Sequence, residues 1–308
     1  MDNASWFDDV PVIGKRSPVE AAAKLREFGD DTAAAALEKR SLTAPNTFGL
    51  LDWFQGKPKA WQHTAHAFGY LAPLAPGGEL TCPIQHAGNI VADNSLKAAR
   101  LKITLDRLRV ADYPGAGVHR VFFDFYAQNQ ICENVEHLHF NTTYRVQEGE
   151  DVASIGYPIF IGLNVGTEGV AFKCYTVNVQ NDDDEAMLGL MESDVFKSGL
   201  RLVSTAQPAL APLSNMAVAL TKSLAKRHRN VPVQDFFLGL DFTAIATRAR
   251  LAEGSYIAVQ IPQSFQLAWD WNEWVYDRNS GQIVNRTDHR QLVPYNYLVL
   301  GVSRYGSP

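Results

Sequence analysis

Residues 134–146 read NVEHLHFNTTYRV, and their alternation decides the fold class. Successive side chains of a strand point to opposite faces, so Leu138, Phe140, Tyr144 and Val146 share one side, which we expect to face the core. The other side carries polar side chains: His137, His139, Asn141, Thr143 and Arg145. We expect that polar side to face water or to be covered by another element of the chain.

Stretches of the same kind follow one another from about residue 97 onward. In LKITLDRLRV (101–110), Leu101, Ile103 and Leu105 alternate before the phase shifts at Leu108 and Val110. Further strand candidates are separated by Gly, Pro, Asn and Asp turns: residues 119–127, 157–165, 168–179, 234–244, 254–262, 269–277 and 294–305. No strand–helix–strand alternation indicates a parallel sheet. The sequence therefore predicts a mainly β protein, an antiparallel β-sandwich of about eight strands.

Helical signals gather near the beginning of the chain. Ser17-Pro18-Val19-Glu20 places Ser at the N-cap, Pro at the first helical position and Glu at the third, and Gly29 is the expected C-cap. A second short helix is expected over 32–40. Because a Pro- and Gly-rich stretch at 73–83 suggests a boundary, we predict a helical N-terminal region over 1–80 and a β-sandwich domain over 81–308.

Two helical insertions are expected inside the sandwich, near residues 183–196 and 210–228. The second has an apolar stripe at helical spacing: Leu213, Met216, Ala217, Leu220 and Leu224.

The composition indicates an ordinary globular protein, with 308 residues, 46% hydrophobic and 20% charged. A net charge of −5 provides no basic field to recruit nucleic acid. Cys82, Cys132 and Cys174 lie far apart, which favours neither a disulfide framework nor a zinc knuckle. There is no signal-peptide pattern, and no run approaches the roughly 20 apolar residues of a transmembrane segment. We expect a cytoplasmic protein.

The pair His137 and His139 is the first candidate metal site. If residues 119–127 and 134–146 form a hairpin centred near residues 130–132, Asp124 lies roughly opposite His139. Two histidines and a carboxylate on one face resemble the ligand set of non-haem iron or catalytic zinc, with His119 as a reserve ligand. The competing interpretation is a pair of exposed strand histidines and no cofactor.

A second histidine pair, His63 and His66, lies in WQHTAHAFGY and would share one face of a helix. The HExxH pattern of a zinc protease is absent. We expect these two rings to pack among Trp61, Phe68 and Tyr70.

An acidic run, Asp182, Asp183 and Asp184, follows a strand and could bind calcium in a sandwich loop. Together with Asp112 and the strand–loop–strand order of residues 108–126, it resembles a C2 domain, which implies a response to calcium or lipid. The chain lacks that family's Asp-Pro-Tyr and its alternating aspartates. The same aspartates also suit the N-terminus of the helix expected at 183–196.

The stretch WDWNEWVYD (269–277) is the candidate binding surface. On a strand, Trp269 and Trp271 share one face and Trp274 lies on the other, so at least one large ring is exposed or covered by another element. The helix at 210–228 and the N-terminal region are the candidate covers.

No nucleophile motif or phosphate-binding loop is present in the sequence. We expect a non-enzymatic binding or assembly protein, a homo-oligomer or the partner of another protein, that self-associates through its sandwich and its N-terminal helical arm. A metal-dependent enzyme using the His/His/Asp face, or a calcium- or lipid-responsive C2-like module, is the alternative.

Overall fold

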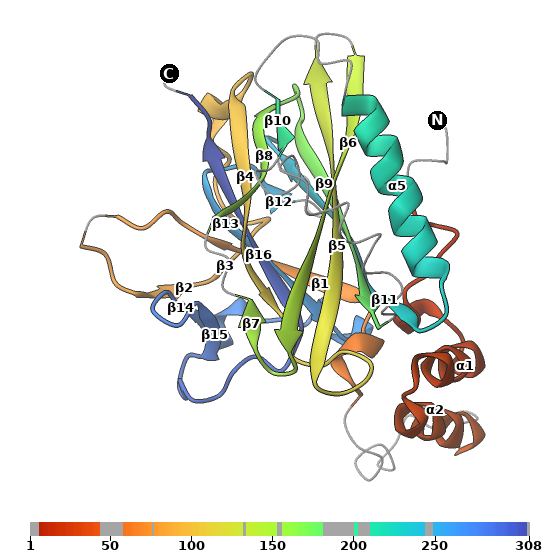
Figure 1. Cartoon of the computed structure of the whole chain (residues 1–308). Helices are drawn as coiled ribbons and strands as arrows, with labels where there is room; N and C mark the ends of the chain where they lie inside the picture. The colour runs from red at the N-terminus through yellow and green to blue at the C-terminus, as the bar shows by residue number, and fades with distance from the viewer. Residues whose placement is uncertain are drawn as a thin grey trace.

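Two β-sheets packed face to face form the body of the protein, and helices lie on one side (Figure 1). The computed structural model describes residues 6–43, 58–75, 77–131, 134–152, 156–180, 200–202, 210–243 and 249–306. The predicted mainly β, antiparallel sandwich with a helical N-terminal region is confirmed. None of the described helices is long and apolar enough to cross a membrane.

The larger sheet has eight strands among the described residues, in the order β10-β8-β4-β16-β13-β1-β3, with β7 paired to β4. These strands are β1 (Ala65–Leu71), β3 (Gln85–His86), β4 (Arg100–Arg109), β7 (Asp151–Val152), β8 (Tyr157–Asn164), β10 (Leu200–Arg201), β13 (Gly254–Ile261) and β16 (Tyr297–Arg304). β1 pairs with β13 along its whole length, so Ala65–Leu71 is part of the larger sheet. The division into 1–80 and 81–308 stays a prediction.

The facing sheet has five described strands in the order β12-β11-β9-β5-β6. They are β5 (Val118–Ile131), β6 (Asn134–Gln147), β9 (Gly169–Val179), β11 (Asn230–Asp241) and β12 (Ala249–Arg250). Leu138 and Phe140 are fully buried between the sheets, which confirms the predicted core side of β6. Full burial of one such side chain stabilises the fold by about 1.5–3 kcal/mol.

A three-stranded sheet in the order β15-β14-β2 covers the outer face of the larger sheet. It consists of β2 (Thr81–Pro83), β14 (Trp274–Asp277) and β15 (Gln282–Asn285). Tyr276 of β14 and Ile283 of β15 share a second hydrophobic cluster with Ile257 of β13 and Val299 of β16. Both faces of the larger sheet are therefore packed.

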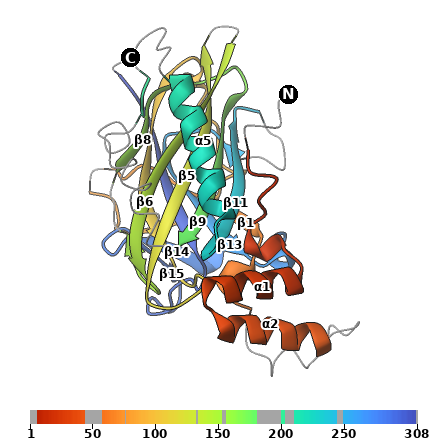
Figure 2. The same ribbon diagram turned by 45° about the vertical axis from the view of Figure 1, so that its right-hand side comes forward.

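Helix α5 (Leu210–Lys226) lies across the outer face of the five-stranded sheet (Figure 2). It occupies the predicted stretch 210–228, with Ala217, Leu220 and Leu224 buried against the sheet. Met216, predicted to lie on the same stripe, is 43% exposed. The helix expected at 183–196 lies outside the described residues.

The helical arm, α1 (Pro18–Phe28) and α2 (Asp31–Thr43), precedes the sandwich. The predicted capping box is present, since Ser17 Oγ accepts from the Glu20 amide while Glu20 accepts from the Ser17 amide. Gly29 ends α1 in the left-handed conformation at φ +97°. Short 3-10 turns complete the described helices: η2 (Ile13–Lys15), η4 (Ala60–Gln62), η5 (Asn94–Leu96), η8 (Gln263–Phe265) and η9 (Trp271–Glu273).

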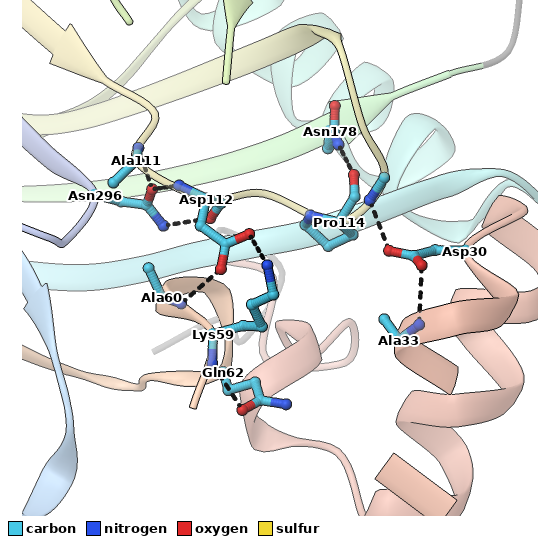
Figure 3. A network of polar contacts seen from close by, with 11 residues as sticks. Asp30, Ala33, Lys59, Ala60, Gln62, Ala111, Asp112, Pro114, Asn178 and Asn296 are labelled. Carbon is cyan, nitrogen blue, oxygen red and sulfur yellow. Dashed lines mark hydrogen bonds and ion pairs between the residues drawn. The ribbon is translucent and has the colours of Figure 1, made fainter. Parts of the chain in front are cut away.

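The loop 111–117 joins the helical arm to the sandwich through a polar network (Figure 3). Asp112 accepts hydrogen bonds from the Ala60 amide at 3.0 Å and from Lys59 Nζ at 3.3 Å. Asn296 Oδ1 accepts from the Asp112 amide at 3.0 Å. On the arm side, Asp30 Oδ2 accepts from the Gly115 amide at 2.9 Å. The arm and the segment before β1 are thus fixed to one loop of their own sandwich.

Candidate functional site

Asp124 and His139, which the sequence placed on one face, lie side by side under α5. The register pairs Asp124 with Asn141 and Tyr126 with His139, and the β5–β6 hairpin turns between Ile131 and Asn134. This register differs from the predicted one by two residues, and a shift of two keeps every side chain on its face. His139 Nδ1 lies 2.9 Å from Asp124 Oδ1, with both side chains buried.

Asp124 has its buried carboxylate satisfied by three donors. Besides His139, the donors are Asn141 Nδ2 at 2.9 Å and Thr221 Oγ1 of α5 at 2.7 Å. Ser214 of α5 accepts from the His139 amide at 3.2 Å. The arrangement ties α5 to the sheet, and a buried carboxylate needs such partners to remain in a protein interior.

The N-terminal segment, residues 6–15, closes this centre from the other side. Trp6 and Phe7 place their rings 6.3 and 6.0 Å from the ring of His139. Asp9 pairs with Lys226 at 2.7 Å, and Tyr175 donates to the Val10 carbonyl at 2.6 Å. The segment is therefore fastened to its own sandwich by both charges and rings.

The third predicted metal ligand, His137, does not join Asp124 and His139. It is exposed and hydrogen-bonds the hydroxyl of Tyr126 through Nδ1. His119, the reserve ligand, lies on the opposite face of β5, five residues from Asp124. Within the described ranges, no three His, Cys, Asp or Glu side chains gather as a metal ion requires. Asp182, Asp183 and Asp184, the calcium candidates, lie outside the described residues.

His63 and His66 pack against aromatic rings, as expected, but the prediction that a helix carries them is wrong. His66 lies in β1, and its ring is 4.8 Å from that of Phe236. The ring of His63 is 5.5 Å from that of Tyr295. Burial lowers the pKa of His66 to about 3 and that of His63 to about 4.

The tryptophans of 269–277 form a stack instead of a two-sided strand. Asp270 caps the short turn η9 by accepting from the Asn272 amide at 2.8 Å, and β14 begins only at Trp274. Trp269 lies parallel to Trp274 at 6.0 Å and edge-on to Trp271 at 5.5 Å. Trp271 and Trp274 are buried, whereas Trp269 is partly exposed. The cover of these rings is the larger sheet, not α5 or the helical arm.

Trp271 packs directly on the backbone of β1 at Gly69. A Cβ atom at Gly69 would lie 2.6 Å from Ile84 Cγ2 and 3.0 Å from the ring of Trp271. Only glycine leaves room for the ring, so β1 positions the tryptophan stack.

Residues 262–268, which we call the apolar loop after Phe265 and Leu267, directly precede this stack in the chain; Gln263, Ser264 and Gln266 are the polar residues of the loop. It connects β13 to Trp269 and contains no charged side chain. Phe265 is 47% exposed and Leu267 is fully exposed. Single exposed apolar residues are ordinary, but an uncharged loop with two of them beside a partly exposed tryptophan resembles the anchor of a binding surface. The sequence indicated the tryptophans; the loop was missed because its residues follow no period.

No protein-family model, no curated protein and no solved structure matches the chain.

Proposed function

We propose that the protein is a non-enzymatic binding protein that self-associates through the apolar loop. The observation that carries the proposal is the exposure of Phe265 and Leu267 beside the stack of Trp269, Trp271 and Trp274. A few residues carry most of the binding free energy of protein interfaces, and aromatic side chains are enriched there.

A second copy of the chain is the proposed partner, because the loops of two copies can meet without electrostatic repulsion between them. The chain has a net charge of −5, so two copies repel each other over most orientations. The loop has no charge of its own, so two loops meet without pairing like charges. The helical arm and the N-terminal segment are fastened to their own sandwich through Asp30, Asp9 and Tyr175, and the proposed contact therefore uses the loop.

The proposed association is weak. A stable interface buries roughly 1,600 Å² in total, and one short loop from each copy supplies only part of that area. A dissociation constant of roughly 10 μM to 1 mM corresponds to a contact of this kind.

The test is a charge placed at the tip of the loop. Leu267 is fully exposed, so Leu267→Asp leaves the folded chain intact while burying a carboxylate in any loop–loop contact. We expect light scattering at high concentration to show association of the wild type and its loss in Leu267→Asp. The matched control is Val91→Asp, at an 88% exposed valine in another segment, which should associate like the wild type. Equal association of Leu267→Asp and the wild type would overturn the proposal.

A further inference from the structure

Two arginines of β4 are buried where the larger sheet meets the three-stranded sheet. Asp106 is the extra residue of a β-bulge, since Leu105 pairs with Leu300 and Arg107 with Val299. Because of this extra residue, the side chains of Arg107 and Arg109 lie on the outer face of the sheet. The side chain of Arg107 is only 9% exposed to solvent and that of Arg109 only 7%. We call them, with Asp151, Tyr297 and Gln282, the arginine cluster.

Asp151 is the carboxylate that the two guanidinium groups share. Its oxygens lie 3.4 Å from Arg107 Nη1 and 3.3 Å from Arg109 Nη1. Gln282 Nε2 also donates to Asp151, at 3.1 Å. Arg109 Nη1 donates to the Gly149 carbonyl at 2.9 Å. One carboxylate thus faces two cations, and the cluster has an excess of one positive charge.

The adjacent Asp106 does not supply the missing charge. Its carboxylate accepts from Thr104 Oγ1 at 2.7 Å and is 3.4 Å from Ser255 Oγ. Burial raises the pKa of Asp106. Among the described residues, the carboxylate that pairs with both guanidinium groups is that of Asp151 and not that of Asp106.

Several donors of the cluster have no acceptor within the described chain. Arg107 Nε and Arg109 Nε are buried without a hydrogen-bond partner, and the hydroxyl of Tyr297, which lies near the Ile283 backbone, has no acceptor. Gly281 closes over Arg107 so tightly that a Cβ atom would lie 1.8 Å from Nη2, which holds the guanidinium in place. Charged donors left unpaired in a protein interior destabilise it, whereas an anion would satisfy them.

We propose that the arginine cluster binds a small oxyanion, of the phosphate or sulfate type. Planar guanidinium groups match oxyanions through paired N–H donors, and Tyr297 would add a neutral donor. The side chains of both arginines keep a small exposure, 9% and 7%, whereas their Nε atoms are buried. An oxyanion there would link β4 to the β14–β15 hairpin through Gln282, so its binding stabilises the junction of the two sheets.

The experiment is calorimetric titration of the full chain with inorganic phosphate, at an ionic strength held constant with sodium chloride. We expect saturable phosphate binding by the wild type, and a loss of at least about tenfold in affinity in Arg109→Gln, which removes a charged donor. Arg304→Gln is the matched control, because Arg304 lies near its own carboxylate, Glu253, at 3.7 Å. It should bind phosphate like the wild type.

Two further variants keep the test decisive if Arg109→Gln fails to fold. Asp151→Asn removes the competing carboxylate, so phosphate affinity should rise severalfold, and Tyr297→Phe should lower it while leaving the charge unchanged. A wild type that shows no saturable binding beyond the chloride control would overturn the proposal. So would phosphate binding that is unchanged in Arg109→Gln or lowered in Asp151→Asn.

Discussion

At the scale of single residues, the buried ring of His66 in β1 makes the stability of the protein depend on pH. Burial holds its pKa at about 3, while the unfolded chain takes up a proton near pH 6.5. The unfolded state therefore binds more protons between these values, so the contribution of His66 is complete above pH 6.5 and falls as the pH is lowered. Between pH 7 and pH 5 the free energy of unfolding loses about 2 kcal/mol from this ring.

Urea unfolding of His66→Leu at pH 7 and pH 5 measures that contribution. The variant should lose about 2 kcal/mol less than the wild type over this interval, because leucine takes up no proton. Val259→Ala, a core variant in which neither side chain takes up a proton, should keep the wild-type dependence. The same pH dependence in His66→Leu and the wild type would show that this ring is not the source.

We expect a large loss of stability when the side chain of Asp124 is removed. Asp124→Ala leaves His139, Asn141 and Thr221 without their shared acceptor in a fully buried site, which costs about 3–5 kcal/mol. Chemical denaturation measures this loss, with the exposed Glu150→Ala as a control that changes stability by less than about 0.5 kcal/mol. A small effect of Asp124→Ala would mean that water replaces the carboxylate.

The sequence predicted part of this centre. Alternation placed Asp124 and His139 on one face, and the two-residue change of register did not alter that result. Thr221 and Ser214 could not be predicted, because they come from a helix more than 70 residues away in the chain. Arg107 and Arg109 carried a readable signal, since they alternate with Leu108 and Val110 where the phase of the strand shifts.

At the scale of elements, the capping box of α1 is the most local prediction. Ser17→Ala removes the acceptor of the Glu20 amide and should destabilise the helix by about 1 kcal/mol. Hydrogen exchange of the α1 amides should become about fivefold faster, since 1.4 kcal/mol corresponds to tenfold. Thr32→Ala, at an exposed position of α2, should leave the exchange of α1 unchanged. Unchanged exchange in Ser17→Ala would contradict the role of the cap.

Elements with a clear period were predicted, and elements without one were not. The phase shift in 101–110 is the bulge at Asp106, and the alternation of β6 matches its burial. β1 was taken for a helix because both of its faces are packed, so its residues show no alternation. The short strands β2, β3, β7, β10 and β12 have two or three residues each, too few for any period. Together with β1 and β15, which were not expected as strands either, they explain why the described residues form more strands than the eight expected.

At the scale of the whole molecule, the layers decide which surfaces remain for binding. The three-stranded sheet covers one side of the sandwich, and α5 with the N-terminal segment covers the other (Figures 1 and 2). This arrangement depends on contacts between distant segments, so the local sequence did not reveal that two of the three tryptophans are buried. The apolar loop is exposed and directly precedes that tryptophan-rich stretch in the chain.

The mass of the wild-type chain in solution tests the central claim most directly. Sedimentation velocity over a series of increasing concentrations should show the average mass rising above the 34.1 kDa of one chain toward twice that value. The rise should be gradual, because the contact is small. A mass that stays at 34.1 kDa up to the highest concentration, or a dimer that persists at the lowest, would contradict weak self-association through the apolar loop.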